Sequence, residues 1–183
     1  PITLAPKKDL LGNRTGHGPC LDPRLLNSIL LSNDRHPIPK IDEIFDQLQG
    51  SIIFSTLDLR QAFHRFQIYE PHRVKTTFTF LGQQYQFRGC PFGRKHIASR
   101  YQRVINSVRS GLPFAQAFVD DIIIFSRTFD EHIQHVQIVI RKLTSANLIL
   151  NSDKCHFAQT CVYLLGFCVD ANGSRLDSRK VSN

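Results

Sequence analysis

Two adjacent aspartates, Asp120 and Asp121, interrupt a segment that is otherwise strongly apolar, AQAFVDDIIIFS. The flanking runs are rich in β-branched and apolar residues, which predicts two strands that reverse direction at the aspartates. Charged groups cost free energy in such surroundings unless they are paired or bind a cation. Aspartate is also a frequent turn residue, but the bulky neighbours lack the glycine or asparagine of an ordinary two-residue turn. The segment therefore predicts a tight hairpin with both carboxylates at its tip.

A third aspartate, Asp58, ends another apolar run, IIFSTLDL. Alone it would be interpreted as a strand-end residue or a helix N-cap. Two-metal phosphoryl transfer, however, requires carboxylates that bridge two cations about 4 Å apart. Magnesium prefers oxygen ligands and takes few of them from protein, the rest coming from water and substrate phosphates. Three aspartates on adjacent strands would meet that requirement.

The remainder of the chain alternates helical and strand patterns without repeats. The first 36 residues are rich in Gly, Pro, Asn and Asp and are expected to form loops with short strands. TTFTF and QQYQF alternate around Leu81-Gly82, which predicts a hairpin. Helices are expected in KIDEIFDQLQG, from about Ile97 to Val108 and from Asp130 to Ala146, and closing strands around Cys155–Phe157 and Val162–Val169. The expected fold class is α+β, a mainly antiparallel sheet with helices packed on one face.

The chain is basic, with 23 Lys and Arg against 15 Asp and Glu and a net charge of +8. This excess favours a polyanionic partner, because neutralising phosphates releases counterions. A hydrophobic fraction of 42% excludes a disordered tail and is enough for one domain with a core. No apolar stretch approaches the ~20 residues of a membrane-spanning helix, so no membrane partner is expected. The absence of methionine leads us to expect a piece of a longer polypeptide.

Five cysteines, an odd number without CxxC pairs, favour free thiols over a disulfide framework. The group Cys155-His156, Cys161 and Cys168 invites a zinc interpretation, but its spacing fits no common ligand pattern. Alternation along strands explains Cys161 and Cys168 equally well. His132 and His135 are three residues apart in a predicted helix, and we expect them on its exposed face rather than at a metal.

FVDDIIIFS, with STLDLRQAFH before it and CPFG between, resembles the reverse transcriptases of LTR retrotransposons, especially the Ty3/gypsy type. Further blocks of that family follow in the same order: DRHPIPKIDEIFDQLQG, YQRVIN, EHIQHV, KCHF and YLLGF. The resemblance implies a polymerase fingers-palm fold over residues 1–183. Fingers-like parts are expected at about 1–57 and 70–97, and the palm at 58–69 and 98–170. The thumb, RNase H and integrase regions of a Pol polyprotein are expected to be absent.

The resemblance also implies the activity of an RNA-directed DNA polymerase, a nucleotidyltransferase. Such an enzyme extends a primer on an RNA or DNA template from dNTPs with two Mg²⁺ ions, for which Mn²⁺ can substitute. It would act with the remainder of a Pol polyprotein in cytoplasmic particles; the nucleus as compartment and a dimer as assembly stay open. An alternative is a degenerate or repurposed domain that binds nucleic acid or protein without polymerising. A third is an unrelated metal-dependent activity such as a nuclease.

Carried over position by position, the resemblance implies three groups of site residues. Asp58, Asp120 and Asp121 would be catalytic and bind the metal ions, with Leu59 as a further metal contact. The dNTP would contact Lys7, Lys8, Gln61, Ala62, Phe63, Phe92 and Gly93, and the primer grip would be Leu165 and Gly166. The ring of Phe63 would lie under the sugar and exclude a 2′-hydroxyl. Ordinary core packing is the alternative for Phe63 and Phe92, and a solvated pair is the alternative for the two lysines.

The sequence departs from the family pattern in the expected nucleotide-binding region. His17 and Gly18 stand where family members usually have Trp-Arg, and Arg14 could replace the missing cation. Arg94–Ala98 replaces the usual Leu-x-Asn-Ala-Pro, and Phe118 replaces a common tyrosine. Losing one charge-assisted phosphate contact would cost ~1.5–3 kcal/mol, enough to impair turnover without unfolding the chain.

Overall fold

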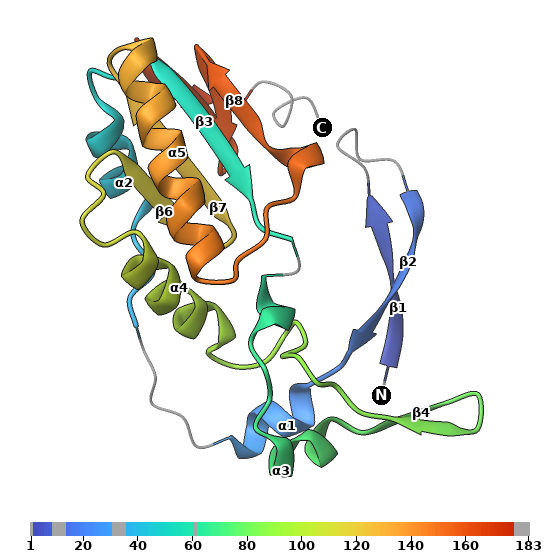
Figure 1. Ribbon diagram of the computed structural model, residues 1–183. Coiled ribbons are helices and arrows are strands. Elements are labelled where there is room, and N and C mark those ends of the chain that lie inside the picture. The colour runs from blue at the N-terminus through green and yellow to red at the C-terminus, as the bar shows by residue number, and fades with distance from the viewer. Residues whose placement is uncertain (1, 9–13, 31–35, 61, 178–183) are drawn as a thin grey trace. The chain divides into compact units, whose positions relative to one another are not determined.

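The computed structural model describes residues 2–8, 14–30, 36–60 and 62–177, except for the side chains of 2–8, 14–15 and 17–20 (Figure 1). The chain divides into two compact units. Unit 1 comprises residues 1–35 and 63–98, and unit 2 comprises residues 36–62 and 99–183. Among the described residues, no helix is both long and apolar enough to cross a membrane.

Unit 1 contains two antiparallel hairpins and several short helices. Its elements are β1 (Ile2–Lys8), β2 (Arg14–Leu21), α1 (Arg24–Ile29), the 3-10 turn η1 (Phe63–Arg65), α3 (Glu70–Arg73), the 3-10 turn η2 (Val74–Thr76), β4 (Phe78–Phe80) and β5 (Gln83–Tyr85). The predicted hairpin at Leu81 and Gly82 is confirmed, and both residues have positive φ, 48° and 72°. That conformation gives the twist that a two-residue β-hairpin requires.

The first 36 residues, expected to form loops with short strands, contain two longer strands. β1 and β2 pair over most of their length, and α1 follows them. Pro19 and Gly18, which favour loops in a sequence, lie within β2. A two-stranded ribbon tolerates them because each of its strands has a free edge where no hydrogen-bond ladder is needed.

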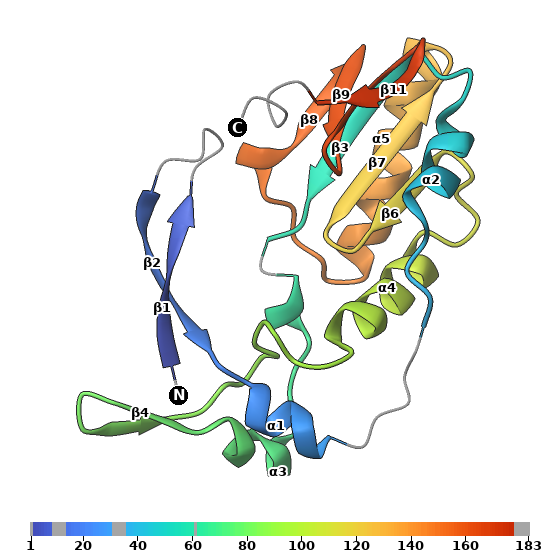
Figure 2. The ribbon, with the colours of Figure 1, turned by 180° about the vertical axis from the view of Figure 1, so that it is seen from behind.

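The centre of unit 2 is a four-stranded antiparallel sheet with strand order β6-β7-β3-β8, and a three-stranded sheet β11-β10-β9 lies near it (Figure 2). The elements of this unit are α2 (Ile41–Leu48), β3 (Ile53–Asp58), α4 (Ile97–Val108, beginning in unit 1), β6 (Ala115–Phe118), β7 (Asp121–Ser126), α5 (Phe129–Ser145), the 3-10 turn η3 (Ser152–Lys154), β8 (His156–Gln159), β9 (Cys161–Leu164), β10 (Phe167–Asp170) and β11 (Gly173–Leu176).

Different elements pack on the two faces of the four-stranded sheet. α4 and α5 cover one face (Figure 1). On that face, Ile122 of β7 lies beside Val139 and Leu143 of α5. On the other face, α2 and the three-stranded sheet enclose a core with strands β3 and β7: Ile44, Leu48, Phe54, Ile123, Phe125, Val162, Leu164 and Val169. The α+β class with antiparallel sheets is confirmed. The two long helices share one face, whereas the short helix α2 lies on the other.

The prediction that His132 lies on an exposed helix face was wrong. The side chain is only 2% exposed. Its Nε2 atom is 2.7 Å from Ser55 Oγ, and its Nδ1 atom is 2.8 Å from Ser126 Oγ. The buried stripe of α5 runs through His132 and Val139, while Ile133 is 43% exposed. Two serines inside otherwise apolar strands supply the polar partners that let an imidazole be buried.

Candidate active site

The predicted aspartate hairpin is confirmed in unit 2. β6 and β7 are joined by a two-residue turn, Val119 and Asp120, because Phe118 and Asp121 are register partners. β3 pairs with β7 on the other side, and the register sets Asp58, its last residue, opposite Asp121. The third carboxylate, Asp120, lies in the turn next to this pair. The strands thus bring all three predicted aspartates to one end of the sheet.

The turn is strained, and a side chain of α4 holds it in place. Val119 has φ 51°, a conformation that is rare for a β-branched residue. Its backbone N–H donates to Gln102 Oε1 at 2.7 Å, and Gln102 Nε2 donates to the carbonyl of Ala117 at 2.9 Å. Gln102 is fully buried on α4. Sequence reasoning missed this positioning role; the available signal was an uncharged polar residue in the apolar stripe of a predicted helix, beside Tyr101.

The surroundings of Asp120 disfavour its ionised form. Its Oδ1 atom is buried and has no hydrogen-bond partner among the described residues. Burial, followed by the negative charges of Asp121 and Asp58, raises the pKa of Asp120 to about 6. Burial and the charges of Asp120 and Asp58 also raise the pKa of Tyr101, so this phenol stays neutral. Like charges and burial both disfavour the ionised carboxylates unless a cation compensates them.

Asp58 is positioned by the segment that precedes β8. Asn151 Nδ2 donates to Asp58 Oδ1 at 3.1 Å, and the Asn151 backbone N–H donates to the Asp58 carbonyl at 2.9 Å. Leu59, the further predicted metal contact, is buried and forms a bridge with Leu150. Asn151 is a second positioning residue that the sequence patterns did not single out.

The donor set fits a divalent cation by its chemistry. A buried carboxylate oxygen without a donor, beside two further carboxylates, is an arrangement that a cation would stabilise. Oxygen donors of this kind are those that Mg²⁺ prefers. Among the described residues, however, no three acidic, His or Cys side chains are gathered closely enough to form a metal-ligand cluster. The strand register brings the three aspartates to one end of the sheet, but their side chains do not form a metal-ligand cluster.

Unit 1 holds most of the residues predicted to contact the nucleotide. Phe63 is buried and its ring meets that of Phe92 edge-on, with centroids 5.2 Å apart. Phe92 is half exposed, at 49%. Asn27 of α1 fixes the turn after Phe92: its Nδ2 donates to the Gly93 carbonyl, and its Oδ1 accepts from the Lys95 N–H, both at 2.8 Å. Asn27 is therefore a further positioning residue of this predicted pocket segment.

Other predicted site residues are placed only in part. The backbone of Lys7 and Lys8 lies in β1, but the structure does not describe their side chains. Gln61 lies outside the described residues. Ala62 is buried in unit 2. The predicted primer grip, Leu165 and Gly166, is the two-residue turn between β9 and β10, with φ 53° and 88°.

The positions that depart from the family pattern also have defined backbone surroundings. His17 and Gly18 lie in β2, opposite Pro6 and Ala5. In the stretch Arg94–Ala98, Arg94 Nη1 is 3.7 Å from Cys90 Sγ. The last two residues of that stretch, Ile97 and Ala98, begin α4.

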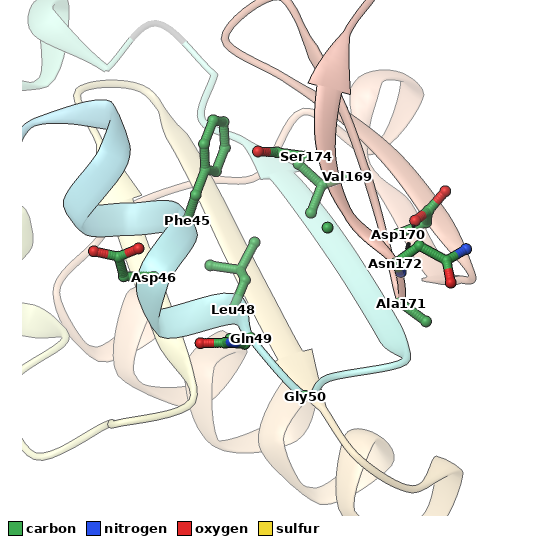
Figure 3. Close-up of a pocket in the computed structure, with 11 residues that line it drawn as sticks. Phe45, Asp46, Leu48, Gln49, Gly50, Val169, Asp170, Ala171, Asn172 and Ser174 are labelled. Atoms are coloured by element: carbon green, nitrogen blue, oxygen red, sulfur yellow. Dashed lines mark hydrogen bonds between the residues drawn. The ribbon is translucent and has the colours of Figure 1, made fainter.

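A separate groove of about 330 Å³ opens in unit 2 (Figure 3). Side chains of α2, including Phe45 and Leu48, lie on one side of it, and residues from Val169 to Ser174 lie on the other. None of the predicted site residues lines this groove.

Comparison with known proteins assigns the chain to a family. The family described as "Reverse transcriptase (RNA-dependent DNA polymerase)" matches residues 5–169, which include the whole aspartate hairpin. The chain belongs to the reverse transcriptase family. Among curated relatives, it is 34% identical over 183 residues to the retrovirus-related Pol polyprotein from transposon opus of Drosophila melanogaster, covering 99% of this chain and 18% of the relative. This reverse transcriptase sequence is thus homologous to gypsy-type retrotransposon Pol polyproteins.

Further relatives extend the same likeness. The Pol polyprotein from transposon gypsy of the same fly is 35% identical over 163 residues, covering 88% of this chain and 16% of the relative. The foamy viral protease-reverse transcriptase in complex with double-stranded DNA superposes with a TM-score of 0.88 at 26% identity, covering 100% of this chain and 32% of that chain. Its complex with an RNA/DNA hybrid gives 0.86 at 25% identity, with 100% and 24% covered. The chain therefore spans less than a fifth of the first curated relatives and a third or less of these viral chains.

Proposed function

We propose that this chain is the polymerising part of an RNA-directed DNA polymerase, with fingers-like parts at about 1–57 and 70–97 and the palm at 58–69 and 98–170. The observation that carries the proposal is the register pairing of Asp58 with Asp121, next to the buried, unpartnered oxygen of Asp120. A structural turn would not need three carboxylates at one strand end, where burial and the charges of Asp121 and Asp58 raise the pKa of Asp120. Membership of the reverse transcriptase family supports the same assignment.

In the proposed reaction, the 3′-hydroxyl of a primer attacks the α-phosphorus of a dNTP, and pyrophosphate leaves. Asp58, Asp120 and Asp121 would hold two Mg²⁺ ions, or Mn²⁺ as a substitute, and Leu59 would add a contact. When bound, such ions activate the attacking hydroxyl and stabilise the charge of the leaving group. Gln102 and Asn151 would keep the carboxylates in place, because each bonds to the backbone or side chain of the catalytic strands.

The proposed substrates are dNTPs and a primer annealed to RNA or DNA. The net charge of +8 favours such polyanions, and the viral relatives were solved in complex with double-stranded DNA and an RNA/DNA hybrid. In unit 1, Phe63 is proposed to lie under the sugar, and the turn held by Asn27 would present Phe92 and Gly93 to the nucleotide. Leu165 and Gly166 are proposed to contact the primer. Action in a cytoplasmic retroelement particle is part of this proposal.

The decisive measurement is primer extension on an RNA template with a DNA primer, in Mg²⁺ and then in Mn²⁺. We expect extension by the parent chain and none by Asp120→Asn. Asp153→Asn is the matched control, since Asp153 is exposed and belongs to no predicted site. Loss of extension in both variants would assign the effect to general charge or stability rather than to the hairpin.

The second candidate, nucleic-acid binding without polymerisation, is favoured by one observation: Gly18 and Arg94–Ala98 replace residues that the family usually has around the nucleotide. A mobility-shift assay with the same primer and template separates the two candidates. Binding without extension by the parent chain would favour the second. Shortened strands instead of longer primers would favour a nuclease.

A further inference from the structure

Two cysteine thiols lie in contact in the three-stranded sheet of unit 2. Cys161 Sγ and Cys168 Sγ are 2.6 Å apart, little more than the ~2.05 Å of a disulfide bond. The register explains why they meet. Cys161 is opposite Asp170 and Cys168 is opposite Tyr163, so the two thiols are diagonal neighbours on one face of the β9–β10 hairpin. Diagonal residues across an antiparallel sheet lie about 7–8 Å apart, so short side chains meet only when they turn toward each other, as these two sulfur atoms do.

The other described cysteines have different surroundings. Cys155 Sγ lies 3.2 Å from the Asn151 carbonyl, and Cys90 Sγ lies 3.7 Å from Arg94 Nη1. Neither contact offers a second sulfur. Of the described cysteines, Cys161 and Cys168 are therefore the two whose thiols the fold places together, and Cys161 is the more accessible of them.

We propose that Cys161 and Cys168 are a dithiol site that closes to an intramolecular disulfide by exchange with a small disulfide such as oxidised glutathione. The Cys161 thiolate attacks one sulfur of glutathione disulfide, and one glutathione thiolate leaves. The Cys168 thiolate then attacks the Cys161 sulfur of the mixed disulfide, and the second glutathione leaves. Two protein thiols are oxidised, one glutathione disulfide is reduced to two thiols, and the two protein protons pass to them.

The surroundings of the pair make this exchange reaction slow. The hydrogen bond with Cys168 and burial raise the pKa of Cys161 to about 11; Asp170 also raises it and Arg175, on β11 opposite Cys168, lowers it. The thiolate is the reactive form, so little of it is present at neutral pH. Exchange at this pair is therefore slow at neutral pH and requires sustained exposure to an oxidising buffer. The bridge would link both strands of the hairpin whose turn is Leu165 and Gly166.

Peptide mapping tests the connectivity. The folded chain is equilibrated with glutathione buffers of increasing oxidised fraction, its remaining thiols are alkylated, and it is digested with chymotrypsin, which cuts at Tyr163 and Phe167 between the two cysteines. We expect one linked peptide pair, lighter by two hydrogens than its free halves, that joins Cys161 to Cys168. Links through Cys155 or Cys90, or mixed disulfides with glutathione as the main product, would overturn the proposal.

Two controls separate placement by the sheet from mere proximity in sequence. The same titration in urea measures the unfolded chain, and we expect the folded chain to reach half oxidation at a ratio of oxidised to squared reduced glutathione at least tenfold lower. Equal midpoints would overturn the proposal. Cys161→Ser should abolish the link and Cys155→Ser should preserve it, with circular dichroism as the check of folding. Because the urea comparison uses the unmutated chain, it decides the matter even if a variant fails to fold.

Discussion

Gln102 Oε1 accepts a hydrogen bond of 2.7 Å from the backbone N–H of Val119, the strained first residue of the aspartate turn. The same side chain donates to the carbonyl of Ala117, so one buried amide supports both the end of β6 and the turn. The position of Asp120 thus depends on a residue of α4 that lies 18 positions earlier in the chain. The arrangement of the carboxylates is a tertiary property as much as a local one.

Replacing Gln102 by Leu should destabilise the hairpin. It leaves the Val119 N–H and the Ala117 carbonyl without this partner, at a cost of about 1–3 kcal/mol for each buried group. Urea unfolding followed by circular dichroism measures the loss. Gln137→Leu, at an exposed position of α5, is the matched control and should change the free energy of unfolding by less than about 0.5 kcal/mol. Equal effects of the two changes would contradict the role given to Gln102.

Asp120→Asn should stabilise the chain in the absence of divalent cations, because it removes a buried charge that Asp121 and Asp58 repel. The pKa of Asp120 is raised from 3.8 to about 6, so the folded state binds this proton more tightly than the unfolded state. The free energy of unfolding of the parent should therefore fall as pH rises from 3.8 to about 6. The contribution of Asp120 to this fall should be absent in Asp120→Asn.

Added Mg²⁺ should make the parent more stable than Asp120→Asn. A cation that binds only the folded state stabilises it by mass action, so the midpoint of urea unfolding should rise with Mg²⁺ in the parent and much less in Asp120→Asn. Asp153→Asn should behave like the parent. A variant that is less stable than the parent without cations would contradict the electrostatic account of the site.

His132 should make stability depend on pH near neutrality. Burial, followed by the charge of His135, lowers the pKa of His132, so the folded state disfavours the proton. Its contribution to stability is present above the unfolded value of 6.5 and is lost as pH falls below it. Unfolding midpoints between pH 7.5 and about 5 should fall in the parent. His132→Gln should flatten this slope, though His135, whose pKa is also lowered, retains part of it.

The control for this slope is His156→Gln, at an exposed position of β8. It should leave the slope as in the parent. A slope unchanged in His132→Gln would show that burial and the charge of His135 do not lower the pKa of this imidazole.

Gly89→Ala should disrupt unit 1. A Cβ at this position would lie 2.1 Å from the backbone carbonyl oxygen of His64, which has no flexible end to move away. We expect a loss of at least about 1–3 kcal/mol, as for an overpacked core, and faster hydrogen exchange in the segments around Phe66 and Cys90, which pair there. Gly82→Asn is the control, since its φ of 72° suits asparagine and nothing lies within 4 Å. Normal exchange in Gly89→Ala would refute the close approach.

Local sequence patterns determined much of the fold and the identity of the catalytic candidates. The two hairpins, at Leu81-Gly82 and at the aspartates, and the helices α2 and α4 lie where periodicity and turn chemistry placed them. These elements depend on neighbours in the chain, whose alternation and turn residues are visible in a single sequence. The family blocks around Asp58 and the aspartate pair likewise carried the assignment that the family comparison confirms.

The tertiary structure decided what those residues touch. Periodicity gave α5 as a helix but misjudged its buried face, because Ser55 on β3 and Ser126 at the end of β7 provide polar partners for a buried His132. Gln102, Asn151 and Asn27 are ordinary polar residues in the sequence. Only long-range packing sets them against the aspartate hairpin, Asp58 and the Gly93 turn. The contact of Cys161 with Cys168 depends on the register of one hairpin. A sequence shows which side chains have useful chemistry, whereas burial and register, which depend on the whole chain, decide which of them meet.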